Sequence, residues 1–78
     1  MAAKYRNISV AVDKFAEAMK RKLLLKAREG WTGWNHAAFG RRCREKLRDH
    51  IPDGDPIDVA NFAMFLWNLG EPTHRKGE

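Results

Sequence analysis

Two clusters of turn-forming residues divide this chain of 78 residues into three segments. The first cluster is Gly30-Trp31-Thr32-Gly33-Trp34, and the second is Pro52-Asp53-Gly54-Asp55-Pro56. Within the segments apolar residues recur at spacings of three and four, and none shows the strict alternation typical of a strand. The pattern predicts an all-α fold with helices over about 9–28, 35–51 and 56–69, in one domain of residues 1–78 that ends in a polar tail at 71–78.

The first segment carries one apolar stripe and a second, weaker apolar line. Ser9 is the expected N-cap. The stripe is formed by Val12, Phe15, Ala16, Met19 and Leu23. Because these residues share one helix face, we expect that face to lie in the core. Leu25 lies on the second line, which either the other two helices or a second subunit would cover.

The third segment has clear start and stop signals and is apolar around most of its circumference. Asp55 fits an N-cap, Pro56 fits the first helical position, and Gly70 ends the helix. A helix of this kind lies centrally in a bundle or at a subunit interface. We therefore expect a compact domain of antiparallel helices with the third helix central, dimeric through Leu25 and Phe65.

The second segment carries the densest charge of the chain. Its inward line is formed by Phe39, Cys43, Leu47 and His50. Arg41, Arg44 and Arg48 lie on one flank of that line, and Arg42 and Lys46 lie on the other. The formal net charge of the chain is +5, which favours an acidic partner. The candidate binding face is formed by Arg41, Arg44, Lys46 and Arg48.

Two tryptophans in the first turn cluster need burial or a ligand. Trp31 and Trp34 either pin the loop onto the core or stack on a flat ligand such as a base. We favour packing.

Several classes of protein are disfavoured. Cys43 is the only cysteine and lies on an apolar line with no base beside it, which argues against a thiol enzyme or a zinc site and favours a reducing compartment. No long apolar stretch follows the N-terminus, so we expect a cytoplasmic protein without a membrane span. The second segment has few side chains that read base edges, which disfavours sequence-specific DNA binding.

Four carboxylates carry the one catalytic hypothesis. Glu45 and Asp49 lie one turn apart on the second helix, and Asp55 and Asp58 open the third. If the four converged, they would hold Mg²⁺, which prefers oxygen ligands and bridges to phosphates. The interpretation that we favour is simpler: Glu45 and Asp49 pair with nearby arginines, and the other two stabilise a helix start.

Several runs of sequence point to a known family. They are Phe15-Ala16-Glu17-Ala18-Met19, Lys22-Leu23, Gly30-Trp31, Gly54-Asp55-Pro56 and, most specifically, Asp58-Val59-Ala60-Asn61-Phe62-Ala63-Met64. In these runs the chain resembles small phage-encoded members of the MazG-like all-α nucleoside triphosphate pyrophosphohydrolases, over roughly Phe15 to Gly70. The family motifs E-E-x-x-E and E-x-x-D, which bind Mg²⁺ and the triphosphate, fall on Glu45, Lys46 and Asp49 and on Asp55 and Asp58. Because Lys46 replaces a carboxylate, the resemblance implies a shortened relative with a degraded metal site.

Three functions are compatible with these observations. The first is a non-catalytic phage or prophage-type binding protein, without a cofactor, that engages a host protein or an acidic ligand through its basic helix in the host cytoplasm and interferes with host defence. The second is an Mg²⁺-dependent pyrophosphohydrolase that uses the four carboxylates. The third is a nucleotide-binding sponge in which Arg41, Arg44 and Arg48 hold phosphates and Trp31 or Trp34 stacks on the base. We favour them in this order.

Overall fold

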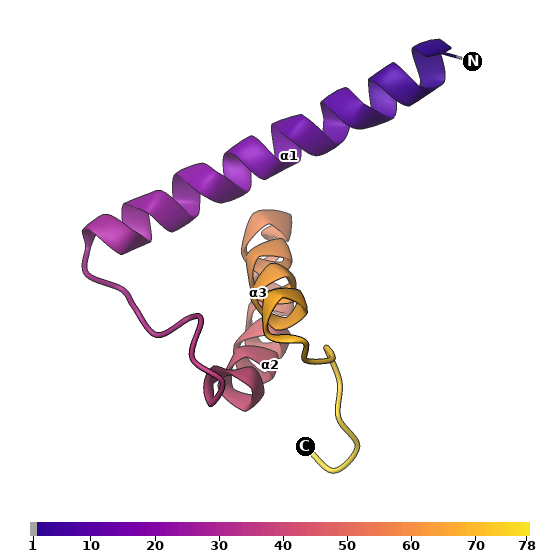
Figure 1. Cartoon of the computed structure of the whole chain (residues 1–78). Helices are drawn as coiled ribbons and strands as arrows, with labels where there is room; N and C mark the ends of the chain where they lie inside the picture. Colours follow the sequence, from indigo (N-terminus) through magenta and orange to yellow (C-terminus); the bar gives the residue numbers. More distant parts are fainter. Residues whose placement is uncertain (1) are drawn as a thin grey trace.

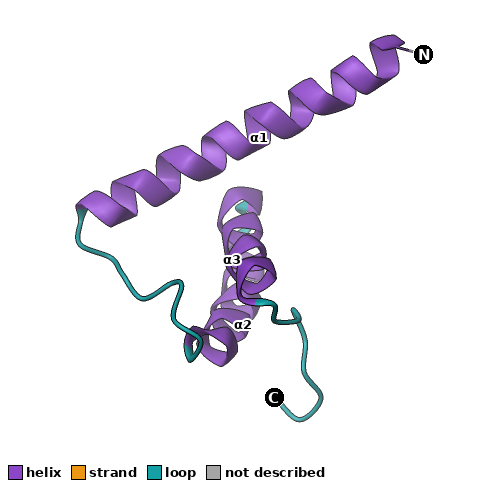
Figure 2. Cartoon of the chain, in the orientation of Figure 1, coloured by secondary structure: helices purple, strands orange, loops and turns teal. Residues whose placement is uncertain are grey.

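The chain folds into three helices joined by two loops (Figures 1 and 2). The computed structural model describes the backbone of residues 2–78 and the side chains from Arg6 onward. Helices α1 (Ala2–Arg28), α2 (Phe39–His50) and α3 (Pro56–Leu69) follow one another, with a short 3₁₀ turn, η1 (Ile51–Asp53), after α2. Residues 2–78 contain no strand, so the all-α prediction is confirmed. None of the helices in this range combines the length and apolar character that crossing a membrane requires.

Helix α3 has the predicted bounds and the predicted caps. The Asp55 carboxylate accepts a hydrogen bond from the Ile57 N–H at 2.9 Å, which satisfies one free donor of the first turn. Gly70 follows the helix with φ +71°, a left-handed conformation that glycine adopts without steric cost. Local sequence signals therefore determine both ends of this helix.

Helix α1 is longer than predicted at its N-terminal end. It begins at Ala2, so Ser9 lies inside the helix and is not an N-cap. The residues before Ser9 include no proline or glycine, and Ala, Lys and Arg all favour a helix. A residue suited to capping permits a helix to start there, but it does not end a helix that has already begun.

Helix α2 begins at Phe39 rather than at Asn35. Two successive turns precede it, in which the His36 N–H donates to the Gly33 carbonyl at 3.1 Å and the Phe39 N–H donates to the His36 carbonyl at 2.9 Å. Gly33 has φ +90°, which starts the first of these turns. Asn35, the first residue of the predicted helix, therefore lies in the loop, and Ala38 occupies the N-cap position of α2.

The core is small and lies mainly between α2 and α3. Its buried apolar residues are Cys43, Leu47, Phe65 and Leu66. The Cys43 thiol donates a hydrogen bond to the Phe62 carbonyl at 3.3 Å, which links the two helices. Helix α3 packs against both α1 and α2, in agreement with its predicted central position.

The predicted core stripe of α1 is covered only in part: Val12 and Phe15 are exposed, whereas Ala16, Met19 and Leu23 are partly buried. Leu23 packs against the core, whereas Val12 is 61% exposed. Helix α1 has 27 residues, against 12 in α2 and 14 in α3, so its first half extends beyond them (Figure 1). The radius of gyration is 14.4 Å, whereas a compact domain of this length has one of about 12 Å. The prediction of a compact domain is therefore wrong.

Candidate functional site

The solvent-facing side of α2 carries four cations, Arg41, Arg42, Lys46 and Arg48, which we call the outer basic face. An open depression of about 490 Å³ lies on it, lined by Ala38, Arg41, Arg42, Glu45, Lys46 and Asp49. The Nε of Arg41 lies 3.6 Å from Oε1 of Glu45, and the two side chains are 71% and 50% exposed. An ion pair this exposed contributes little to stability, so a partner can replace it at low cost.

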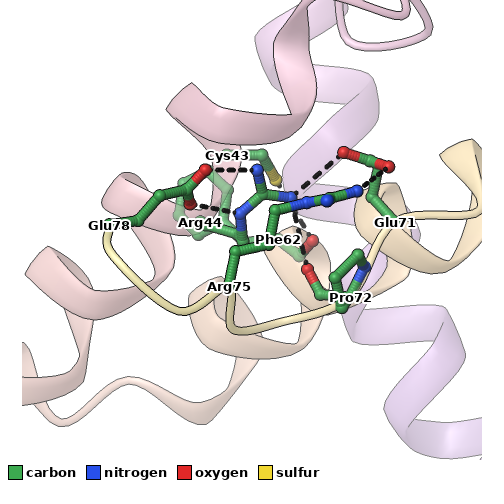
Figure 3. A network of polar contacts seen from close by, with 7 residues as sticks. All are labelled: Cys43, Arg44, Phe62, Glu71, Pro72, Arg75 and Glu78. Atoms are coloured by element: carbon green, nitrogen blue, oxygen red, sulfur yellow. Dashed lines mark hydrogen bonds and ion pairs between the residues drawn. The ribbon is translucent and has the colours of Figure 1, made fainter.

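Arg44, predicted to belong to this face, is buried instead. Its side chain is 3% exposed. Its Nε and Nη2 donate to the two carboxylate oxygens of Glu78 at 2.6 and 2.8 Å, and its Nη1 donates to Glu71 at 3.1 Å (Figure 3). All three nitrogens of the guanidinium therefore donate hydrogen bonds within the chain. It is not available to hold a ligand, which corrects the predicted binding face.

Glu71 and Glu78 have a structural role that the sequence pattern did not indicate. Both belong to the polar tail, which folds back over α2 so that its last residue reaches Arg44 (Figure 3). Glu71 also accepts a hydrogen bond from Arg75 at 3.0 Å. Gly40 allows this approach, because a Cβ at position 40 would lie 2.7 Å from Oε1 of Glu71.

The tail network changes the acidity of its members. Hydrogen bonds from Arg44 hold the pKa of Glu78 below its usual value. Hydrogen bonds from Arg44 and then Arg75 do the same for the pKa of Glu71. The same hydrogen bonds, above all those to Glu78, raise the pKa of Arg44. At neutral pH the network is therefore fully charged.

The tryptophans of the first loop pack on the core, as we favoured. The ring centroid of Phe65 lies 5.4 Å from that of Trp31 and 5.5 Å from that of Trp34. Phe39 completes the cluster, with its centroid 6.1 Å from that of Phe65. Both tryptophan rings thus hold the loop against α3. Stacking on a base was the alternative role for these two side chains.

The two residues predicted to form a subunit interface differ in their accessibility. Leu25 is 58% exposed on α1. Phe65 is 3% exposed at the centre of the aromatic cluster, so it cannot contact a second subunit in this fold. The helical spacing of α3 places Phe65 on the same side as Asn61 and Asn68, which suggested that it is exposed. It is covered by the loop that carries Trp31 and Trp34, which precedes α2 in the sequence.

The four carboxylates of the catalytic hypothesis lie in two separate pairs. Asp55 and Asp58 share the Lys22 ammonium, with Nζ at 2.6 and 2.7 Å from their oxygens. Glu45 and Asp49 instead line the depression on the outer basic face. Within the part of the chain that the structure describes, no group of three or more His, Cys, Asp or Glu side chains is placed to hold a metal ion. Lys22 supplies the positive charge between the aspartates, so this donor set does not fit Mg²⁺.

The ion pairs of Lys22 shift the pKa values of Lys22 and of Asp55. Hydrogen bonds to Asp55 and Asp58 raise the pKa of Lys22. The hydrogen bond from Lys22, followed by that from the Ile57 N–H, lowers the pKa of Asp55. This contact joins α1 to the start of α3 and was not predicted, because its partners lie 33 and 36 residues apart.

One buried polar side chain on α3 has an unpaired atom. Asn61 is 5% exposed, and its Oδ1 has no hydrogen-bond partner among the described residues. It lines a narrow cavity of about 80 Å³ together with Trp31, Asp58 and others. A buried acceptor without a partner is destabilising.

Comparison of the chain with models of protein families, with curated proteins and with solved structures finds no match. The argument for function therefore rests on the geometry of the surfaces described above.

Proposed function

We propose that this chain is a small, non-catalytic helical binding protein that engages an acidic segment of another protein through the outer basic face. The observation that carries the proposal is the open depression of about 490 Å³ on α2, bordered by exposed Arg41 and Arg42 and by partly exposed Lys46. Arginine donors in such a position form charge-assisted hydrogen bonds with carboxylates. The net charge of +5 would speed the encounter with an acidic partner.

The mixture of charges on this face favours a protein segment over a nucleotide. Glu45 and Asp49 lie between the cations of the depression. A triphosphate concentrates its negative charge in a small volume and would meet these two carboxylates. An acidic helix or extended segment can instead place carboxylates against the cations and its own cations against Glu45 and Asp49. Both loop tryptophans pack on Phe65, which accounts for them without a base and so further weakens the sponge hypothesis.

The resemblance to phage-encoded proteins supplies the biological setting of the proposal. A phage protein of this kind would act in the host cytoplasm, on a host protein, where it would interfere with host defence. The pyrophosphohydrolase is the alternative within the same resemblance. That activity would require Mg²⁺ to replace Lys22 between Asp55 and Asp58. It would also require Glu45 and Asp49, which line a separate surface, to move next to these aspartates.

A binding titration tests the proposal. Fluorescence anisotropy would compare a short labelled glutamate-rich peptide, labelled dATP with Mg²⁺, and a labelled DNA duplex, all at about 0.15 M salt. The test variant is R41E/R42E. The matched control is K20E/R21E, which makes the same change in net charge at two exposed residues of α1.

We expect the peptide to bind most tightly, R41E/R42E to weaken it by about tenfold or more, and the control to weaken it by less than about threefold. An equal loss in both variants would mean that only net charge matters and would overturn the assignment of the face. Tighter binding of dATP, or its hydrolysis, would overturn the proposal in favour of the sponge or the hydrolase.

A further inference from the structure

The first half of α1 presents an apolar surface that none of the described side chains, from Arg6 onward, covers. Ile8 is 65% exposed, Val12 is 61% exposed and Phe15 is 39% exposed, and they continue the stripe that reaches the core at Leu23. In Figure 1 this half of α1 extends past the end of α3. Isolated exposed apolar residues are ordinary on a protein surface, but a continuous stripe marks an interface.

Phe15 stands between two hollows on this surface. The first, of about 390 Å³, is lined by Ala11, Val12, Phe15, Ala16, Met19 and Ala60. The second, of about 590 Å³, is lined by Phe15, Ile51, Gly54, Asp55, Pro56, Val59 and Ala60. One surface therefore provides both a protruding ring and apolar space that could receive one. A surface with both features can pair with itself about a two-fold axis.

The exposed area of the chain exceeds that of a compact monomer by more than one side of a standard interface. The accessible surface is 6218 Å². A compact monomer of the same mass, 9.0 kDa, exposes about 4,900 Å². The excess of about 1,300 Å² is more than the roughly 800 Å² that each partner buries in a standard stable interface. Two copies joined by this surface would remove the excess.

The charges along α1 favour a second copy over an acidic partner at this surface. Residues 6–19 contain two cations, Arg6 and Lys14, and two anions, Asp13 and Glu17. The charged residues of the stretch 20–28 are all cations: Lys20, Arg21, Lys22, Lys26 and Arg28. An acidic partner would be drawn to the second half of α1. In a two-fold pairing centred on residues 6–19, where two cations face two anions, the cationic stretches 20–28 of the two copies point away from each other.

We infer that the first half of α1 is the contact between two copies of this chain, with Phe15 of each copy seated in a hollow beside Phe15 of the other. The interface lies at Val12 and Phe15 and not at the predicted Leu25 and Phe65. It is separate from the outer basic face, so the dimer would present two such faces and bind a partner carrying two acidic segments with avidity. This inference does not rest on the proposed binding function.

Sedimentation equilibrium at tens of micromolar protein tests the inference. The wild-type chain is expected to show twice the mass of 9.0 kDa. Val12→Glu is expected to show the mass of one chain, because a buried unpaired carboxylate is unfavourable at an apolar contact. Leu24→Glu is the matched control and should remain a dimer, because Leu24 lies on the same helix and is 64% exposed, close to the 61% of Val12. Circular dichroism would verify that both variants keep their helices.

A proximity measurement locates the interface independently. Pyrene attached at Val12→Cys should give excimer emission in the dimer, and pyrene at Leu24→Cys should give none. Cys43 will not take the label in the folded chain, because it is fully buried and burial raises the pKa of its thiol to about 11.

A wild-type mass of one chain would overturn the inference. So would a dimer that survives Val12→Glu, or excimer emission from position 24 alone. Binding of the acidic peptide is measured separately, so a failed dimer and a failed binding face give different results.

Discussion

Replacing Phe65 with alanine should remove most of the stability of this chain. Phe65 is 3% exposed and is one of four buried apolar residues among those that the structure describes, so few other core contacts can compensate for its loss. Truncation of a buried phenylalanine costs about 3–5 kcal/mol. The upper part of that range applies because three aromatic rings lie within 6.1 Å of Phe65, centroid to centroid. A chain of this length has a free energy of unfolding of about 4–12 kcal/mol in total.

Thermal unfolding followed by circular dichroism measures this loss. At about 4–8 °C per kcal/mol, the midpoint for Phe65→Ala should fall by about 12 °C or more. Tryptophan emission adds a local signal, because Trp31 and Trp34 contact Phe65 whereas Trp67 is 81% exposed. The emission of the variant should therefore shift to longer wavelength even where its helices remain.

Trp67→Ala is the matched control for this experiment. It removes a larger side chain from the same helix, but from its exposed side, so it should cost less than about 0.5 kcal/mol. A loss below about 1 kcal/mol for Phe65→Ala would refute the assignment of this core. An equal loss in the control would refute it as well, because it would mean that Trp67 is buried in solution.

Two further predictions concern polar groups. The pKa values of Glu71 and Glu78 are lowered, so the stability that they contribute is complete above the pKa of about 4.3 of an unfolded-chain glutamate and is lost as the pH falls through their folded-state values. The free energy of unfolding, measured with urea between neutral and acidic pH, should show this decline. Glu78→Gln should make the decline shallower, whereas the control Glu17→Gln on α1 should leave it as steep as in the wild type. Asn61→Leu should leave the unfolding midpoint unchanged or raise it, because the Asn61 Oδ1 is buried without a partner. A lower midpoint for Asn61→Leu, with Asn68→Leu unaffected, would indicate that the amide does form a hydrogen bond in solution.

The parts of the fold that local signals determine were predictable from the sequence. Asp55, Pro56 and Gly70 act on their own neighbours, so the bounds of α3 follow from them. The period of α1 gave the face of its stripe, but it could not show whether that face would be covered. Coverage depends on the lengths of α2 and α3, which are about half that of α1.

The candidate site was predictable only in part, for the same physical reason. Arg41 and Arg44 are the same residue type on the same flank of α2, yet one is exposed and the other is buried. The difference comes from Glu71 and Glu78, which lie 27 and 34 residues after Arg44 and reach it only because the tail folds back. No pattern within α2 contains that information.

The contact between Gly40 and Glu71 makes position 40 a reporter of the state of the tail. Any side chain at this position must push the Glu71 carboxylate away, because its Cβ would lie 2.7 Å from Oε1. Arg44, which is 3% exposed, would then retain Glu78 as its remaining carboxylate partner. In a saturation library, position 40 should therefore favour glycine while Glu71 holds this place, and a larger residue should be accepted where the flexible Glu71 side chain moves aside. Conditions or ligands that lift the tail would widen the set of accepted residues, so deep mutational scanning at this one position would reveal tail release in living cells.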